Sequence, residues 1–346
     1  MDLLEVAGSM QFGDIHIKTD AKTGLKAIIA IHNTHLGPAL GGCRCVSYPT
    51  HDAAVLDAMR LAQGMSYKAA IATIPHGGGK SVLIKPDMPY DREAMFESFG
   101  EFVETLAGRY ITAVDSGSSV KDMDVIARKT KHVVSISKHA GGKGDPSPYT
   151  SLGVLRGIQA AVQFKLGKDS LAGIHVAIQG AGNVGYHLSK LLVDLGAKIS
   201  VCDSKPEAER RFATDFNARI VPNEAIFDLD CDVFAPCALG AILNDKTAHS
   251  LKASIVAGGA NNQLANPRVA QLLHKRGILY ATDYVINAGG LIHVSIDNAE
   301  EIKLKVDHIY DALQEIFQRS QEDDLPTSVV ADDIAQEIIN AAKPFH

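Results

Sequence analysis

A glycine-rich segment in the second half of the chain has the spacing of a dinucleotide-binding turn. It follows a predicted strand (174–179) and begins a predicted helix (183–196), which is the context that phosphate binding requires. Gly180 would allow the tight turn, Gly182 would let the backbone approach a pyrophosphate, and Gly185 would let helix and strand pack closely. The helix N-terminus would offer N–H groups and a positive dipole end to the phosphates. The candidate cofactor-binding residues here are Gly180, Ala181, Gly182, Asn183, Val184 and Gly185.

A carboxylate stands at the end of the next predicted strand (198–202). Asp203 lies 18 residues past Gly185, close to the spacing at which an acidic residue binds the ribose of a dinucleotide. Such an acid accepts a hydrogen bond from the 2′-hydroxyl and repels a 2′-phosphate, which favours NAD over NADP. Lys205 argues the other way, because a lysine could meet a phosphate. The alternative is an ordinary tight turn with an aspartate at a strand end, but the complete pattern favours NAD.

Three charged residues in the first half of the chain could carry protons. Lys80 follows three glycines (77–79), but the phosphate-loop pattern fails because Ile74 occupies the place of its first glycine. Lys68 lies in an apolar stretch, and two lysines in one apolar cleft would repel each other and be desolvated. Both effects lower a lysine pKa, which suits a general base. Asp115 follows a predicted strand and is a candidate proton carrier. Whether Lys68, Lys80 and Asp115 lie close together depends on the tertiary structure.

The elements that must position these residues alternate between strands and helices. Glycine, proline and aspartate are dense over 139–148, which predicts a domain boundary there. The alternation beyond it predicts a parallel sheet covered on both faces. The predicted strands are 25–31, 81–84, 111–114, 174–179, 198–202, 232–235, 254–257 and 278–280. The predicted helices are 52–65, which ends near Gly64, then 92–106, 149–164, 183–196, 300–318 and 329–342.

The fold class is therefore predicted to be α/β with two domains. We expect one domain over residues 1–140, joined by a C-terminal helix at about 325–346, and a Rossmann-type domain over 141–324. A length of 346 residues fits about two domains. Of these residues, 46% are hydrophobic and 21% charged, which is typical of a globular protein and argues against disorder.

Composition also argues against several classes of function. The net charge is −6, without blocks of like charge, which argues against nucleic-acid binding through bulk electrostatics. No apolar run approaches the roughly 20 residues of a membrane-spanning helix, and the acidic N-terminus is unlike a signal peptide. Five cysteines favour a reducing cytoplasm over a disulfide scaffold. The spacing of Cys43 and Cys45 is poor for zinc, so we expect no metal site.

Several motifs occur together and in a fixed order between about residues 27 and 331. They are LGPALGGCR, GMSYKAA, GGGKSV, TAVDSGSSVKDMD, GDPSPYTSLGV, GAGNVG, FAPCALG, AGGANNQL and DYVINAGG. By these motifs the chain resembles the glutamate/leucine/phenylalanine/valine dehydrogenase superfamily, and within it most closely the leucine dehydrogenases. The resemblance implies a homo-oligomer and a cleft between the two domains. It also implies NAD-dependent oxidative deamination of an L-amino acid to a 2-oxo acid and ammonia.

The resemblance also assigns roles to single residues. It implies that Lys68 binds the substrate carboxylate and that Lys80 is the catalytic lysine, which activates water. It implies that Asp115 relays protons to and from the substrate nitrogen. It further implies that Thr150 and Asn261 hold the nicotinamide end of the cofactor, with the neighbouring Asn262 as an alternative to Asn261.

The same resemblance predicts an apolar substrate side chain. Glutamate dehydrogenases hold the side-chain carboxylate with a lysine and a serine, and Leu40 and Val294 stand at those positions here. The expected pocket residues are Leu40, Gly41, Met65, Ala113, Leu291 and Val294. We therefore expect leucine, valine or isoleucine as substrate, with phenylalanine or tryptophan as the alternative. Two remoter alternatives are an inactive NAD-binding protein and a 2-hydroxy acid dehydrogenase, although no histidine occurs in a motif that would supply the latter's base.

Overall fold

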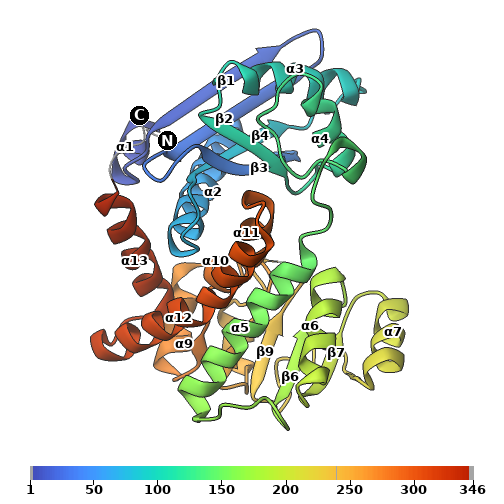
Figure 1. The fold of residues 1–346 in the computed structure, drawn as a ribbon, viewed down its shortest axis with the longest axis vertical. Coiled ribbons are helices and arrows are strands. Elements are labelled where there is room, and N and C mark those ends of the chain that lie inside the picture. Colours follow the sequence, from blue (N-terminus) through green and yellow to red (C-terminus); the bar gives the residue numbers. More distant parts are fainter. Residues whose placement is uncertain (1–2, 239, 343–346) are drawn as a thin grey trace. The chain divides into compact units, whose positions relative to one another are not determined.

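The computed structural model describes residues 3–238 and 240–342, which form two compact units (Figure 1). The first unit consists of the residues up to Gly144 together with those from Ala335 on. The second unit consists of Asp145–Ile334. Each unit contains one β-sheet with helices packed against it, so the predicted α/β fold class is confirmed. The substrate and cofactor roles of the two parts stay predictions.

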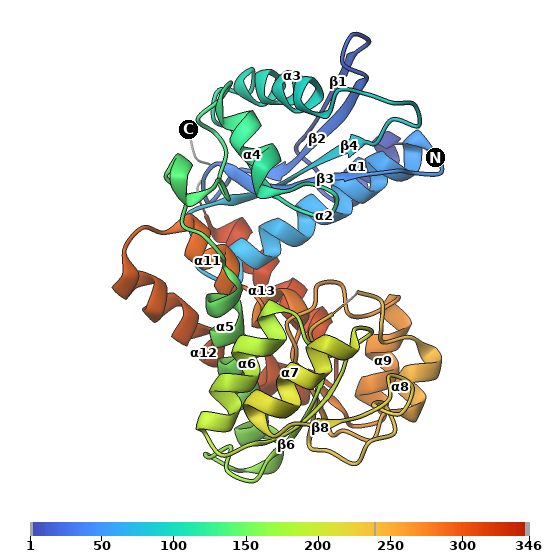
Figure 2. The same ribbon diagram turned by 90° about the vertical axis from the view of Figure 1, so that its right-hand side faces the viewer.

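The sheet of the first unit is mixed. Its order is β1-β2-β4-β3-β5, in which β2 is antiparallel to β1 and β4, and β3 is parallel to β4 and β5. Helices α1 and α2 pack on one face, and α3 and α4 pack on the other (Figure 2). The bounds are α1 Leu3–Ser9, β1 Asp14–Asp20, β2 Leu25–Asn33, β3 Ala39–Val46, α2 His51–Ile71, β4 Gly77–Ile84, α3 Arg92–Glu104, β5 Tyr110–Val114, α4 Val120–Ala127 and a 3₁₀ turn Lys138–Ala140.

Alternating side chains of β2 build two separate cores in this unit. Ile29 and Ile31 pack with Phe96, Phe99 and other residues on the α3 side. Ala30 packs with residues of α2 on the opposite face. Both faces of the strand are thus buried, and its sequence is apolar almost throughout, as expected for a central strand.

Helix α2 is longer than the sequence analysis predicts. It begins after the N-cap Thr50 and continues through Gly64 to Ile71, so the prediction that it ends near Gly64 is wrong. The buried residues Ala69 and Ala70 belong to its last turns. Their burial outweighs the conformational cost of one glycine in a helix, which is about 1 kcal/mol. As a result Lys68 is a helical residue rather than part of a loop.

Gly64→Ala should stabilise the first unit. A Cβ at this position meets no atom within 4 Å, and the residue is helical. We expect the melting temperature to rise by about 1–4 °C, from the lower entropy of the unfolded chain. Gly78→Ala is the matched contrast, because its Cβ would lie 2.1 Å from the Ser66 backbone nitrogen and should lower the melting temperature. A decrease for Gly64→Ala would contradict a continuous helix.

The glycine run before Lys80 is part of strand β4. The strand begins at Gly77 rather than Ser81, so the run is no loop that cradles a ligand. A Cβ on Gly77 would lie 2.1 Å from the Asn33 carbonyl oxygen, and one on Gly78 would collide with α2. These glycines let a helix and a neighbouring strand approach β4 closely. The helices α1 and α4 and the strands β1 and β3 were not predicted. Strand β1 is half-buried and polar, and β3 has two glycines in its middle, so neither has the pattern of a buried strand.

The second unit contains a six-stranded parallel sheet. Its order is β8-β7-β6-β9-β10-β11, which is the 3-2-1-4-5-6 order of the doubly wound nucleotide-binding fold. The predicted Rossmann-type sheet is confirmed. The strands are β6 His175–Gln179, β7 Lys198–Cys202, β8 Arg219–Ile220, β9 Val233–Pro236, β10 Ile255–Val256 and β11 Leu279–Tyr280. The helices are α5 Ser147–Leu166, α6 Asn183–Asp194, α7 Pro206–Phe216, α8 Asp245–Ser250, α9 Pro267–Lys275, α10 Asp283–Ile286, α11 Gly289–Ser295, α12 Ala299–Asp323 and α13 Thr327–Ala341.

The last helix, α13, contributes residues to both units. From Ala335 on it belongs to the first unit, where Gln336 accepts a hydrogen bond from the Tyr67 hydroxyl at 3.3 Å. The backbone oxygen of Ile339 lies 3.3 Å from Nδ1 of His35. Among the helices of the described residues, none combines the length and apolar character needed to span a membrane.

Candidate active site

Lys80, Asp115 and Arg44 converge in the first unit because β3, β4 and β5 are neighbours. Lys80 Nζ lies 2.9 Å from Asp115 Oδ2, and Arg44 Nε donates a hydrogen bond to the same oxygen at 3.0 Å. In the strand register, Gly42 of β3 pairs with Ala113 of β5. Two residues further along each strand direction come Arg44 and Asp115, which therefore meet.

These side chains occupy the sheet face that α2 covers. Residues two apart in a strand share a face, so Leu40 and Gly42 lie on the same side as Arg44. Ala30, which pairs with Lys80, belongs to the core beneath α2. The predicted substrate residues Leu40 and Ala113 thus share a face with Lys80, and Leu40 is buried. Met65 is a half-buried residue of α2.

Burial and charge act in opposite directions on Lys80 and Asp115. Lys80 is 5% exposed, and burial lowers the pKa of its ammonium below 10.5, with Asp115 opposing this only in part. Burial alone would raise the pKa of the Asp115 carboxyl, but Lys80 and Arg44 together hold it below its usual value. The pair therefore combines an ionised carboxylate with a lysine that loses its proton more readily, as general acid–base catalysis requires.

The cation that lowers the pKa of Lys80 is Arg44. Arg44 adds to the larger effect of burial. The expected repulsion between Lys68 and Lys80 stays a prediction. Lys68 is a half-buried residue of α2. Sequence reasoning missed Arg44, although it occurs in the motif LGPALGGCR that carried the resemblance.

Glycines of β3 make room for this cluster. A Cβ on Gly42 would lie 2.6 Å from the Asp115 Cβ and 3.2 Å from Lys80 Nζ. A Cβ on Gly41 would lie 1.7 Å from the Gly79 carbonyl oxygen, so this position requires glycine for packing alone. The Gly41 carbonyl also accepts a hydrogen bond from the buried Tyr110 hydroxyl at 2.7 Å. A role of Gly41 in substrate binding stays a prediction.

The glycine-rich turn of the second unit has the geometry of a phosphate-binding turn. Gly180 has a φ of +104°, and its Cβ would lie 2.7 Å from that of Ala238. A Cβ on Gly185 would lie 2.2 Å from the Gly180 carbonyl oxygen, so helix α6 packs closely on the turn. At Gly182, the N-cap of α6, a Cβ would meet nothing within 4 Å and no side chain caps the helix. The turn is thus open at the helix end that attracts phosphates.

Asp203 is anchored beside this turn. Its carboxylate accepts hydrogen bonds from the backbone nitrogens of Ala181 at 2.7 Å and Lys205 at 2.9 Å. A cavity of about 710 Å³ adjoins it at the carboxyl ends of β6 and β7. Ligands of doubly wound sheets bind at this edge, where the strand order reverses. The cavity lining includes Gly180, Asp203, Asn223, Phe227, Ile242 and Asn244.

Arg211 of α7 is a cation near the turn that sequence reasoning missed. Its Nη2 donates to the Ala181 carbonyl at 3.2 Å, and its guanidinium lies over the ring of Tyr186, 4.4 Å from the centroid. The side-chain nitrogen of Asn183, the first residue of α6, donates a hydrogen bond to the Asp145 carboxylate at 3.4 Å. Val184 packs close to Gly259, where an added Cβ would lie 2.8 Å from Val184 Cγ1. Only the packing of α7 against α6 shows that Arg211 is close.

The residues predicted to hold the nicotinamide surround the segment between α10 and α11. A Cβ on Gly290 would lie 2.5 Å from Thr150 Oγ1, so this glycine makes room for the threonine. Asn261 Oδ1 accepts a hydrogen bond from Asn287 at 2.7 Å. Asn262, the alternative, has a φ of +51°. Leu291 and Val294 are half-buried residues of α11, which belongs to the second unit, whereas Lys80 belongs to the first.

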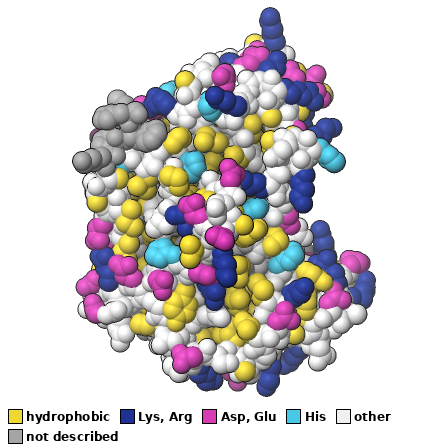
Figure 3. Space-filling view, in the orientation of Figure 1, with side chains coloured by type: hydrophobic (Ala, Val, Ile, Leu, Met, Phe, Trp, Pro, Cys, Tyr) yellow, Lys and Arg dark blue, Asp and Glu magenta, His cyan; other side chains and the backbone are white. Residues whose placement is uncertain are grey.

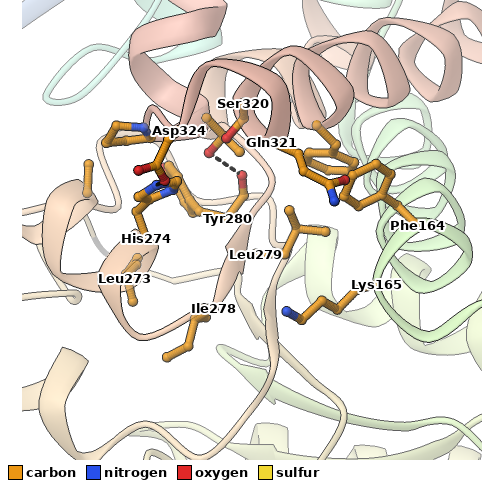
Figure 4. A pocket seen from close by; sticks show the side chains of 15 residues that line it. Phe164, Lys165, Leu273, His274, Ile278, Leu279, Tyr280, Ser320, Gln321 and Asp324 are labelled. Atoms are coloured by element: carbon orange, nitrogen blue, oxygen red, sulfur yellow. Dashed lines mark hydrogen bonds and ion pairs between the residues drawn. The ribbon is translucent and has the colours of Figure 1, made fainter.

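Another cavity of about 450 Å³ lies over the edge strand β11 (Figure 4). His274 Nε2 lies 2.9 Å from Asp324 in it, and Ser320 donates a hydrogen bond to the Leu325 carbonyl. None of the predicted site residues lines this cavity.

In the part of the chain that the structure describes, no three His, Cys, Asp or Glu side chains gather as metal ligands. On the face shown in Figure 3, charges of both signs are interspersed with hydrophobic side chains.

Two family models match the chain. Residues 10–132 match "Glu/Leu/Phe/Val dehydrogenase, dimerisation domain", and residues 141–208 and 205–325 match "Glutamate/Leucine/Phenylalanine/Valine dehydrogenase". The leucine dehydrogenase of Geobacillus stearothermophilus is 46% identical, over 100% of this chain and 96% of the relative. The valine dehydrogenase of Streptomyces coelicolor is 44% identical, over 94% of this chain and 91% of the relative.

A solved structure extends the similarity to three dimensions. The crystal structure of L-tryptophan dehydrogenase from Nostoc punctiforme has a TM-score of 0.87 and 42% identity, and the match covers 98% of each chain. The family models cover most of the described residues, and the similar proteins match over nearly their whole length. The chain therefore belongs to the Glu/Leu/Phe/Val dehydrogenase family and is an amino acid dehydrogenase.

Proposed function

We propose that this protein is an NAD-dependent dehydrogenase of branched-chain L-amino acids. The main support for this proposal is that the buried Lys80 pairs with Asp115 on a sheet face that also includes Leu40. The proposed reaction converts an L-amino acid, NAD⁺ and water to a 2-oxo acid, ammonium, NADH and a proton. The leucine and valine dehydrogenases among its relatives support this substrate class.

The residues of the first unit would manage binding and protons. Lys68 binds the substrate carboxylate, and Asp115 takes a proton from the substrate nitrogen. Lys80, which burial brings closer to neutrality, accepts a proton from the water that attacks the imine carbon. Lys80 passes that proton to solvent, and Asp115 returns its proton to the nitrogen. Lys80 then accepts the proton of the carbinolamine hydroxyl as the C–N bond breaks, which gives ammonia and the 2-oxo acid. When bound, NAD⁺ supplies the acceptor for the hydride that leaves the substrate Cα.

The second unit fits NAD. The open position at Gly182 would receive the pyrophosphate, and Asp203 would accept a hydrogen bond from the ribose. Thr150 and Asn261 would hold the nicotinamide end. Support comes from the three distinct packing environments of Gly180, Gly182 and Gly185, which match the three roles that glycine has in such a turn.

Asp203→Ser should change the cofactor preference. The carboxylate repels a 2′-phosphate, so its removal should lower kcat/KM with NAD and raise it with NADP, each by about tenfold. Lys205 would then be available to the phosphate, and titration calorimetry with the two reduced cofactors should show the same reversal in Kd. Glu207→Gln, which removes an exposed acid from the first turn of α7, serves as the control for charge. Equal use of both cofactors by the unmodified protein would refute the role of Asp203.

An apolar substrate side chain follows from the residues around Lys80. A glutamate carboxylate placed against Leu40 would lose water without gaining a partner, which costs about 1–3 kcal/mol on protein mutational scales. Leucine or valine would gain about 0.8 kcal/mol per buried CH₂. Aromatic substrates are the second candidate, because the tryptophan dehydrogenase structure matches nearly the whole chain.

A substrate panel tests the proposal. We expect kcat/KM, followed by NADH absorbance, to be highest for leucine, valine or isoleucine and at least about tenfold lower for glutamate. Phenylalanine and tryptophan are measured under the same condition. An aromatic optimum would establish the second candidate instead, and glutamate as the best substrate would overturn an apolar pocket. Absence of turnover with every amino acid would reject the function.

We also propose a homo-oligomer. The description of the family model over residues 10–132 as a dimerisation domain supports self-association through the first unit. Sedimentation equilibrium should give a mass that is a multiple of 36.9 kDa. A mass of a single chain at micromolar concentration would reject this proposal.

A further inference from the structure

We propose that Arg44 is a positioning residue for Asp115 and is held in that task by Asp57 and Tyr48. The inference rests on the proposed dehydrogenase activity, because it assigns a role within the same proton-transfer pair. In this role Arg44 contacts neither the substrate nor the cofactor. It acts through the carboxylate that it shares with Lys80.

The geometry is a chain of four side chains, which are Arg44 of β3, Tyr48 after β3, Asp57 of α2 and Asp115 after β5. Arg44 Nε donates to Asp115 Oδ2 at 3.0 Å, and its Nη1 donates to Asp57 Oδ2 at 2.9 Å. Tyr48 donates its hydroxyl to the same Asp57 oxygen at 2.5 Å. Arg44 is mostly buried, with 20% of its side chain exposed. The guanidinium thus bridges helix α2 and the end of β5 through Nε and Nη1.

A planar guanidinium suits this bridge better than an ammonium. Its nitrogens form a rigid fork that binds two carboxylates in fixed directions, whereas a lysine offers one flexible point charge. Asp115 Oδ2 is therefore held from two sides, by Arg44 and by Lys80. When one partner moves or loses its charge, the other still fixes the carboxylate.

The permanent charge of Arg44 matters when Lys80 is neutral. A buried carboxylate whose sole cationic partner loses its charge tends to take up a proton. Arg44 stays charged at all relevant pH values, so Asp115 keeps a cationic partner throughout the cycle. Asp115 can then still be a carboxylate when Lys80 is neutral, so it does not simply take the proton that Lys80 loses and stays ready to accept the proton of the substrate nitrogen.

The charged groups around Lys80 set the direction of each pH effect. Arg44 of β3 lowers the pKa of Lys80, while Asp115 after β5 and Asp57 of α2 raise it. Tyr48 and the buried Cys43 have pKa values that burial raises, so both stay neutral near pH 8. Removing Arg44 should raise the pKa of Lys80, and removing the charge of Asp57 should lower it.

The test compares Arg44→Gln, Arg44→Lys and Asp57→Asn in the full chain. We expect Arg44→Gln to lower kcat by about 10²-fold with little change in KM, and to move the acid limb of kcat/KM to higher pH. Arg44→Lys should keep the limb near its wild-type position but lose about tenfold in kcat. Asp57→Asn should move the limb to lower pH. Arg109→Gln, which breaks an exposed ion pair with Asp14 in the same unit, is the control and should leave the profile unchanged.

Chemical rescue separates positioning from a general loss of structure. Guanidinium added to Arg44→Ala should restore at least about tenfold in kcat, and it should restore nothing in Lys80→Ala. An unchanged pH profile in Arg44→Gln, or the absence of rescue in a folded Arg44→Ala, would overturn the role of Arg44 while the activity itself stands. A wild-type protein without turnover would instead overturn the proposed function, and the positioning role with it.

Discussion

Replacing Lys80 with alanine should lower kcat for the preferred amino acid by about 10²- to 10⁴-fold, the usual contribution of a general base. Lys80 is 5% exposed and pairs with Asp115 at 2.9 Å, so water cannot readily replace its amine in the same position. Burial lowers the pKa of this lysine. We therefore expect the acid limb of the wild-type kcat/KM profile to lie below the ordinary lysine value of 10.5 and to disappear in the variant.

Two measurements make this result specific. The affinity for NADH, measured by calorimetry, should barely change, because the glycine-rich turn belongs to the second unit. Lys26→Ala removes an exposed lysine from β2 of the same sheet and should keep wild-type kcat. Near-normal turnover by Lys80→Ala would remove this residue from the mechanism. Replacement of Lys68 should differ by raising KM for the amino acid as well as lowering kcat.

Gly42→Ala should also abolish most of the activity, although it adds a single methyl group. The new Cβ would lie 2.6 Å from the Asp115 Cβ, 3.0 Å from the Val114 carbonyl oxygen and 3.2 Å from Lys80 Nζ. Strand β5 or the Lys80–Asp115 pair has to shift. A displacement of about 1 Å in a catalytic group can cost about 10²-fold in rate, so we expect a decrease in kcat of that size.

Gly64→Ala is the matched control for this variant. It adds the same methyl group to the same unit, at a place where nothing lies within 4 Å, and should keep wild-type kcat. Circular dichroism should show both variants folded, and NADH affinity should be equal in both. If Gly42→Ala retains more than a third of the wild-type kcat, the close contact of Gly42 with Asp115 and Lys80 is not needed for the reaction.

Local patterns made the glycine-rich turn of the second unit predictable, although strand β8 and the helices α7, α8, α9, α10 and α11 were not predicted. The turn at Gly180–Gly185 and the carboxylate of Asp203 belong to one strand–helix–strand segment, so their spacing along the chain already defines their contacts. The structure places the Asp203 carboxylate 2.7 Å from the Ala181 nitrogen within that segment. Sequence determined this turn because a positive φ and two close approaches admit few residues other than glycine.

Contacts between distant segments were decided by the tertiary structure. Sequence analysis selected Lys80 and Asp115 but not Arg44, which lies 71 positions from the aspartate it holds. Only the parallel register of β3 with β4 and β5 places these three side chains on one face. The apolar residues predicted to form one substrate pocket belong to different units. Leu40 and Ala113 lie in the first unit, and Leu291 and Val294 lie in the second.

The sequence by itself determined which residue types could carry protons, bind a dinucleotide or exclude a charged side chain. It did not determine where α2 ends or why three glycines precede Lys80, since both depend on how closely the helix packs on β4. The low pKa of Lys80 likewise needs its burial and the cation of Arg44. Desolvation and pairing energies depend on distances in space, and spacing along the chain specifies such distances only within a single supersecondary element.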